Sequence, residues 1–95
     1  MWGVCITRME TVLTLIQFKN QQVIINFYED DELIHREGLF FESIQIADHQ
    51  VQFYKGVLII FSVPFDEYSN FLQRTEFKNY YSLEKDNKIV ELYFP

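Results

Sequence analysis

The sequence predicts one mainly β (α+β) domain over residues 1–95, built as a highly curved antiparallel sheet or a small open barrel. Hydrophobic residues make up 48% and aromatic residues 18% of this 95-residue chain, enough for one core but not for two. β-branched and aromatic residues, which favour strands, are frequent, whereas Ala47 is the only alanine. Three glycines and two prolines leave no flexible linker.

The first half of the chain predicts a succession of strands, over residues 12–18, 22–28, 33–41, 44–46 and 50–54. A short polar connection over residues 19–21 predicts a hairpin between the first two. Four adjacent carboxylates over residues 29–32 predict an exposed turn, because like charges repel and favour water. Gly38 marks a predicted bulge in the third strand.

The second half begins with the apolar run of residues 57–61, which predicts a central strand buried on both faces. The one helix is predicted at about residues 64–74. Pro64 suits a first helical position, and the acids Asp66 and Glu67 followed by Arg74 complement the helix dipole. The spacing of Phe65, Tyr68, Phe71 and Leu72 predicts that this helix packs on the sheet.

A two-residue turn, Asp86-Asn87, predicts a C-terminal hairpin of residues 80–85 and 88–94. This turn places Lys85 opposite Lys88, Leu83 opposite Val90, Tyr81 opposite Leu92 and Tyr80 opposite Tyr93. The whole chain therefore predicts about seven or eight strands, with one short helix before the final hairpin.

The beginning of the chain is apolar but soon reaches Arg8 and Glu10, so we expect no signal peptide. Met9 is a candidate natural start, because the clear β pattern begins only at Thr11. The alternative is that residues 1–8 form an added edge strand or a ragged end. No run approaches the roughly 18 apolar residues of a membrane span, so we expect no membrane partner.

The net charge of −6 and the pI of about 4.7 make direct nucleic-acid binding a poor hypothesis, because phosphate contacts require clustered Lys and Arg. Cys5 is the only cysteine, which excludes an internal disulfide and fits a reducing cytoplasm. Frequent Ile, Phe, Tyr, Asn and Lys suit an AT-rich genome, such as that of a low-GC bacterium or its phage.

No motif for catalysis or metal binding is present. Residues 29–32 lack the alternating ligands and central glycine of a calcium loop. Cys5, His35 and His49 have no metal-ligand spacing and would meet only through the fold. No serine lies in a nucleophile elbow. We therefore expect a protein that is not an enzyme and needs no cofactor.

The favoured hypothesis is a non-enzymatic protein–protein interaction module of unknown partner, which includes an acidic inhibitor or adaptor. Its candidate residues are the acids Glu29, Asp30, Asp31 and Glu32 and the aromatic residues Tyr80 and Tyr93. One alternative is a structural subunit that self-associates as a homo-oligomer through a strand edge. A second alternative is a barrel that binds a small ligand or a metal.

Overall fold

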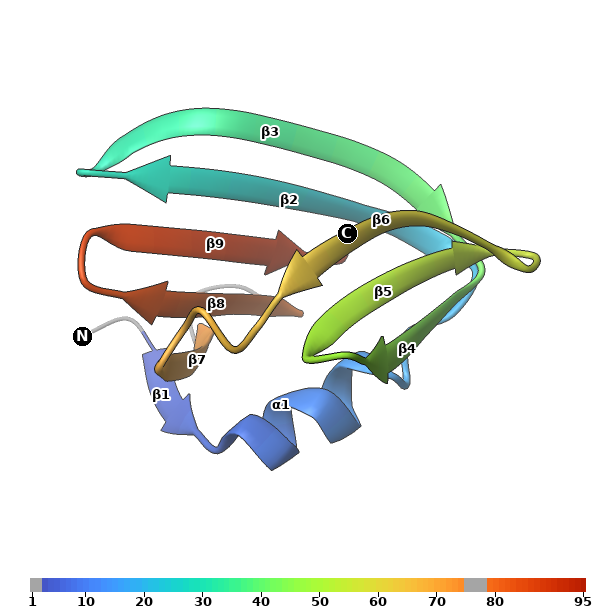
Figure 1. Cartoon of the computed structure of the whole chain (residues 1–95), viewed down its shortest axis with the longest axis horizontal. Coiled ribbons are helices and arrows are strands. Elements are labelled where there is room, and N and C mark those ends of the chain that lie inside the picture. The colour runs from blue at the N-terminus through green and yellow to red at the C-terminus, as the bar shows by residue number, and fades with distance from the viewer. Residues whose placement is uncertain (1–2, 75–78) are drawn as a thin grey trace.

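Two antiparallel sheets share one hydrophobic core in the computed structural model (Figure 1). It describes residues 3–74 and 79–95, without the side chains of residues 3–6, 8 and 74. One sheet has the strand order β1-β7-β8-β9-β2-β3, and the other has the order β4-β5-β6. The elements are β1 (Gly3–Ile6), α1 (Arg8–Leu15), β2 (Gln21–Glu29), β3 (Glu32–Phe41), β4 (Ser43–Ala47), β5 (Gln50–Lys55), β6 (Leu58–Pro64), β7 (Asn70–Arg74), β8 (Tyr80–Lys85) and β9 (Lys88–Tyr93).

The predicted fold class is confirmed: the protein is mainly β, with curved antiparallel sheets and one short helix. The described strands do not close into a barrel, because β3 and β6 each pair with a strand on one side only. Glu42 alone separates β3 from β4, so the chain crosses from the six-stranded to the three-stranded sheet at that residue.

The position predicted for the helix is wrong. In residues 64–74, β6 continues to Pro64, a turn follows, and β7 pairs with both β1 and β8. The aromatic side chains Phe65, Tyr68 and Phe71 are buried, as the predicted stripe required, but a turn followed by a strand achieves this. Spacing by three residues therefore did not distinguish a helix from this arrangement.

The helix α1 lies where the pattern predicted a strand over residues 12–18, so that strand and the hairpin over residues 19–21 are also wrong. A capping box begins α1: the Thr7 hydroxyl accepts a hydrogen bond from the Glu10 N–H at 3.0 Å, and the Glu10 carboxylate accepts one from the Thr7 N–H at 2.9 Å. Leu15, on the buried face of the helix, has no exposed surface.

Other predictions survive with small changes. The C-terminal hairpin has the predicted register throughout. β3 carries its bulge at Ile34 rather than at Gly38: Gly38 pairs in register with Ile24, whereas Phe27 opposes His35 and the next residue, Tyr28, opposes Leu33. β1 pairs with β7 at one margin of the six-stranded sheet, so the edge-strand alternative holds for residues 3–6, whereas Arg8 already belongs to α1 and residues 1–2 lie outside the described part.

The core joins both sheets and α1. Its fully buried apolar side chains, those with 0–2% exposure, are Leu15, Val23, Ile25, Phe41, Val51, Phe53, Val63, Leu83, Val90, Leu92 and Phe94. Phe41 packs edge-on against Phe53 with ring centroids 5.3 Å apart, and Phe18 stacks on Phe94 at 4.0 Å. These aromatic contacts fill the space between the sheets.

Candidate functional site

The longest run of exposed large apolar side chains in the described residues lies at the start of β6. We call these four residues the β6 strip. Their exposed fractions are 92% for Val57, 68% for Leu58, 50% for Ile59 and 38% for Ile60. Among the described strands β6 pairs only with β5, so the strip lies on a sheet margin, near the right-hand end of Figure 1. The prediction of a central strand buried on both faces is wrong.

The turn between β5 and β6 is fixed by Gly56 and Glu42. Gly56 has a φ of +64°, a conformation that glycine adopts with little strain. Its N–H donates to Oε1 of Glu42 at 2.7 Å. The Glu42 N–H donates to the Tyr54 carbonyl at 2.8 Å, and the Glu42 carbonyl accepts from the Asn20 N–H at 3.0 Å. Glu42, at the junction of the two sheets, therefore fixes the β5–β6 turn that leads into the strip.

A bulge separates the strip from the core. Phe53 of β5 opposes Phe61 of β6, but the next residue, Tyr54, opposes Ile59. Ile60 is thus the extra residue on β6, and such a bulge bends and twists its strand. The strip continues beyond this bend, where its side chains leave the core.

The free edge of β6 has backbone groups pointing outward. The Phe65 N–H donates to the His49 carbonyl, so these two residues form a hydrogen-bonded pair. Hydrogen-bonded and non-hydrogen-bonded pairs alternate along antiparallel strands, so the next pair, Pro64 opposite Gln50, has no hydrogen bond between its residues. The outward position of Pro64 explains why its missing N–H is tolerated. Two residues earlier, Ser62 has the same orientation by strand alternation. Its N–H and C=O therefore point away from β5.

This edge also lacks charge. Residues 56–65 are the longest run of the chain without Asp, Glu, Lys or Arg. Native proteins usually protect exposed strand edges with charged side chains, prolines or a covering segment. Here a proline protects only the far end of β6, so the half that carries the strip remains available for pairing.

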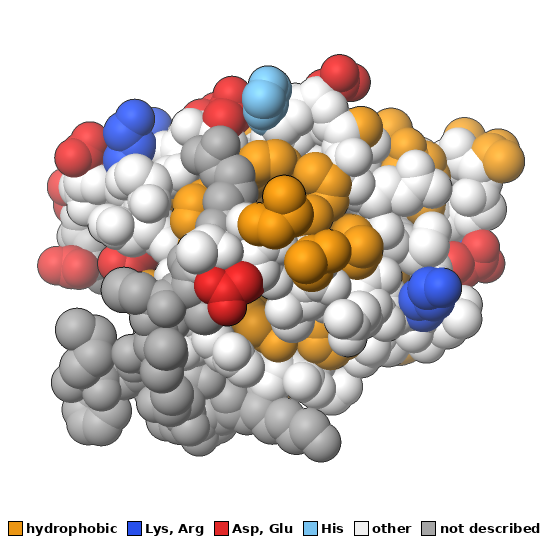
Figure 2. Space-filling view, turned by 90° about the horizontal axis from the view of Figure 1, so that it is seen from below, with side chains coloured by type: hydrophobic (Ala, Val, Ile, Leu, Met, Phe, Trp, Pro, Cys, Tyr) orange, Lys and Arg blue, Asp and Glu red, His pale blue; other side chains and the backbone are white. Residues whose placement is uncertain are grey.

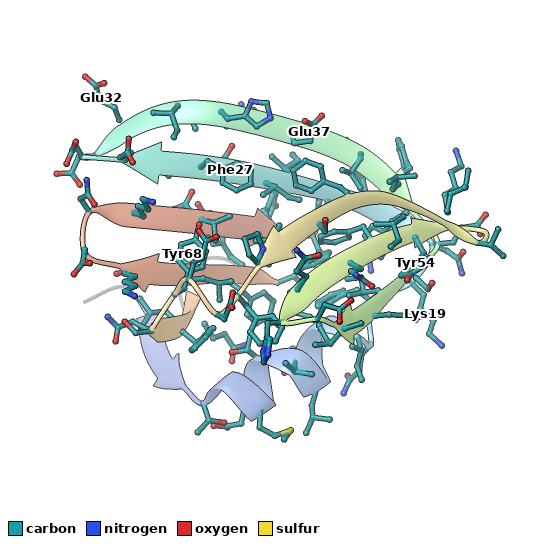
Figure 3. The ribbon with its side chains drawn as sticks, viewed as in Figure 1. Lys19, Phe27, Glu32, Glu37, Tyr54 and Tyr68 are labelled. Atoms are coloured by element: carbon teal, nitrogen blue, oxygen red, sulfur yellow. The ribbon has the colours of Figure 1, made fainter. Side chains whose placement is uncertain are left out.

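The acidic turn predicted over residues 29–32 is confirmed as a turn, and Figure 3 shows Glu32 at the outer end of β3. Asp30 and Asp31 both have positive φ, which aspartate tolerates in such turns. The Asp30 N–H donates to the Asn87 carbonyl at 3.0 Å, and the Asn87 amide donates to the Asp30 carboxylate at 2.8 Å. The turn is therefore tied to the β8–β9 turn, at the end of the molecule opposite the strip (Figure 1).

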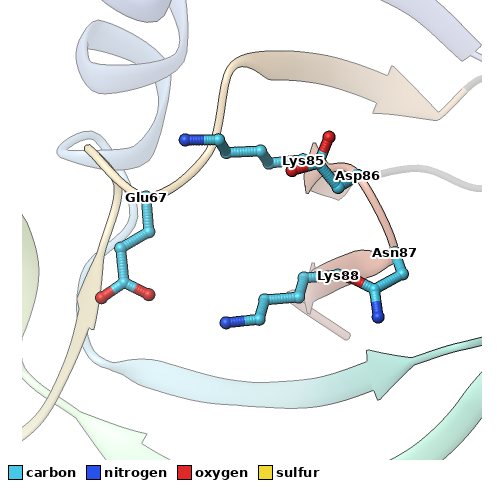
Figure 4. A pocket seen from close by; sticks show the side chains of 5 residues that line it. All are labelled: Glu67, Lys85, Asp86, Asn87 and Lys88. Atoms are coloured by element: carbon cyan, nitrogen blue, oxygen red, sulfur yellow. The ribbon is translucent and has the colours of Figure 1, made fainter.

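Basic side chains lie beside this acidic turn. Lys88 opposes Glu29 on one side and Lys85 on the other. Lys85, Lys88 and Glu67 line an open pocket of about 350 Å³ next to Asn87 (Figure 4). Because opposite charges stand close together there, the acids do not form an isolated negative surface.

Tyr80 and Tyr93 lie on the six-stranded sheet and are not part of the β6 strip. They oppose each other in the β8–β9 hairpin, with ring centroids 5.5 Å apart. Their strand neighbours Tyr81 and Leu92 are buried, so by alternation the Tyr80–Tyr93 pair occupies the outer face of the sheet. Both rings are partly buried, and together they form an aromatic pair on that face.

The histidines lie apart from each other in the fold. His35 of β3 contacts Glu37 on the same strand, with Nε2 and Oε1 3.0 Å apart, while His49 lies in the β4–β5 turn beside Phe65. The side chain of Cys5 is outside the described part of the structure. Within that part, no three His, Cys, Asp or Glu side chains gather as a metal site would require.

A small pocket of about 250 Å³ lies between the end of β6 and the six-stranded sheet, with Phe27, Ile34 and Tyr68 in its lining. Figure 3 labels Phe27 and Tyr68. Burial, and to a lesser degree the Glu67 carboxylate, raise the pKa of the Tyr68 phenol, so this hydroxyl stays protonated at neutral pH. The pocket is mostly aromatic and aliphatic, with no histidine in its lining.

A second apolar area lies around α1. Met9 is 66% and Leu13 51% exposed, and a shallow groove runs from Val12 and Ile16 of this region to Ile46 of β4. Figure 2, which views the molecule from the side of α1, shows apolar side chains gathered near the middle of this face. Unlike the strip, these side chains come from separate elements.

The β6 strip was missed in the sequence because a continuous apolar run indicates burial without saying what buries it. The signal available was the absence of any charge over residues 56–65 together with Pro64 inside that run, since proline within a strand is confined mainly to sheet edges.

The fold and the strip define a class: a small antiparallel β protein with an exposed apolar strand edge. Comparison with protein-family models, with curated proteins and with solved structures finds no match for the chain. Among the described residues, no helix has the length and apolar character needed to cross a membrane.

Proposed function

We propose that this chain is a non-enzymatic protein-interaction module, and that its partner adds an extended, uncharged, apolar strand to the free edge of β6. The observation that supports this most strongly is the β6 strip: four consecutive aliphatic side chains, from 38% to 92% exposed, at the unpaired margin of a sheet. Apolar patches of this kind commonly mark binding sites.

Strand addition suits the site for two reasons. The outward N–H and C=O of Ser62 provide main-chain hydrogen bonds for an added strand, as in other proteins that bind extended segments. Covering Leu58, Ile59 and Ile60 removes apolar surface from water, which favours association before the entropy cost of binding is subtracted.

The chemistry of the edge also supports an uncharged partner segment. A charged residue placed against residues 57–62 would lose its hydration without gaining an opposite charge. The acidic turn over residues 29–32 lies at the other end of the molecule, so in this proposal it contributes to net charge rather than to the contact.

The test is a pull-down with tagged chain from a lysate of the source organism that also contains the untagged chain. Leu58→Lys introduces a charge into the strip. Leu33→Lys is the matched control, because Leu33 is also exposed, at 48%, but lies on β3. We expect wild type and Leu33→Lys to retain the same protein in stoichiometric amount, and Leu58→Lys to retain at least tenfold less.

The purified complex gives a second readout. Hydrogen exchange of the Ser62 amide should slow when the partner is bound, while exchange in the acidic turn should not change. Equal retention by Leu58→Lys and wild type, with both proteins folded by circular dichroism, would refute the proposal.

A further inference from the structure

The β6 strip has opposite charges beyond its two ends. Lys55 precedes it, and Asp66 and Glu67 follow β6. Within the described residues, neither Lys55 nor Asp66 forms an ion pair. The acid at the Lys55 end, Glu42, has a carboxylate oxygen bonded to the Gly56 N–H. The edge is thus uncharged in its middle, with a free cation at one end and a free carboxylate at the other.

Such an edge is complementary to itself in the antiparallel direction. A two-fold axis at Ser62 would place the Ser62 residues of the two chains opposite each other, which brings together the backbone N–H and C=O groups that point outward. The same axis places the Lys55 end of each chain beside the Asp66 end of the other. Both ion pairs then form at once, because the contact is symmetric.

We propose that the partner of the β6 edge is a second copy of this chain, paired antiparallel through β6. The inference rests on the proposed function and names its partner. The two three-stranded sheets would join into one continuous sheet across the axis. The axis passes through the longest uncharged run of the chain, so two molecules of net charge −6 have no negative side chains next to the axis.

The first measurement is the mass of the purified chain by light scattering and sedimentation over a range of concentrations. We expect a concentration-dependent rise from 11.5 kDa towards twice that mass. Leu58→Lys should remain monomeric at every concentration, and Leu33→Lys should dimerise like the wild type.

Charge reversal then tests the antiparallel register. Lys55→Glu and Asp66→Lys should each raise the dimer dissociation constant by about tenfold, because each replaces two symmetric attractions with repulsions. The double variant Lys55→Glu/Asp66→Lys should return to within about threefold of the wild type, since the charges are again opposite. Both substitutions are at exposed positions, Lys55 at the end of β5 and Asp66 in the turn after β6, so circular dichroism is expected to show an unchanged fold for all three variants.

A wild-type chain that stays monomeric at millimolar concentration would overturn the second-copy inference. If the monomeric wild type retained a different protein in the pull-down, and Leu58→Lys did not retain it, the proposed function would stand with another partner. A dimer that Leu58→Lys does not disrupt, or a double charge variant that is not restored, would overturn the inferred contact.

Discussion

Replacing Leu15 with alanine is expected to lower the free energy of unfolding by about 3 kcal/mol, whereas Leu13→Ala should lower it by less than about 1 kcal/mol. The two leucines lie two residues apart in α1, but Leu15 is fully buried and Leu13 is 51% exposed. Truncating Leu15 removes its transfer free energy and leaves a cavity beside the core. A helix of eight residues is not stable alone in water, so α1 depends on this contact.

Urea unfolding followed by far-ultraviolet circular dichroism measures both variants against the wild type. The expected result is a large fall of the midpoint for Leu15→Ala and a small one for Leu13→Ala, with similar slopes for all three proteins. Equal losses for the two variants would refute the assignment of the buried helix face. A loss below about 1 kcal/mol for Leu15→Ala would refute the contact between α1 and the core.

Three further predictions concern single residues. Ser82→Ala should raise the free energy of unfolding by up to about 1 kcal/mol, because the buried Ser82 Oγ has no hydrogen-bond partner among the described residues; thermal melting checks this. Gly56→Ala should lower it by about 1 kcal/mol in urea unfolding, since an added Cβ meets no atom within 4 Å and the cost is backbone strain at φ +64°. Hydrogen bonds from the Thr7 backbone, then from its hydroxyl, hold the pKa of Glu10 below its ordinary value of 4.5. The resulting stability is present above pH 4.5 and is lost as the pH falls through the lower folded value, so the melting temperature of Glu10→Gln should change less than that of the wild type between about pH 7 and pH 3.

How far the sequence predicted the fold depended on whether the deciding interaction was local. The Asp86-Asn87 turn fixed the register of the last hairpin, because a two-residue loop leaves one alignment of its strands. The helix was misplaced although a local signal existed. Thr7 and Glu10 stand at capping-box spacing, and apolar side chains at positions 12, 13, 15, 16 and 18 are spaced as on a helix rather than alternating.

The wrong helix over residues 64–74 has a different cause. Long-range contacts bury Phe65, Tyr68 and Phe71. β7 pairs with β1, which is far from it in the chain, and with β8, which follows it. Such pairings override local propensity and leave no trace in a short window. The candidate site escaped prediction for a related reason: the apolar pattern of residues 57–61 predicts burial and carries no sign that β6 lies at a margin of its sheet.

Of the predicted site residues, Tyr80 and Tyr93 were correctly paired, because their pairing follows from the same two-residue turn. The acids of residues 29–32 were correctly placed in a turn, yet their contact with Asn87 joins segments more than fifty residues apart. Only the folded chain brings those acids beside Lys85 and Lys88, which reduces their value as an isolated docking surface.

Glu42 fixes the orientation of the β6 edge independently of the side chains that this edge exposes. Its main chain is bonded to Asn20 and Tyr54, and its carboxylate holds the turn that precedes the strip, at Gly56. The direction in which the edge faces is therefore determined at the sheet junction, by a residue outside the strip. The aliphatic residues of the strip can therefore be substituted to suit a different added strand without changing the direction of the edge. Glu42→Ala, in contrast, would keep the sequence of the strip but remove the hydrogen bond that fixes its orientation.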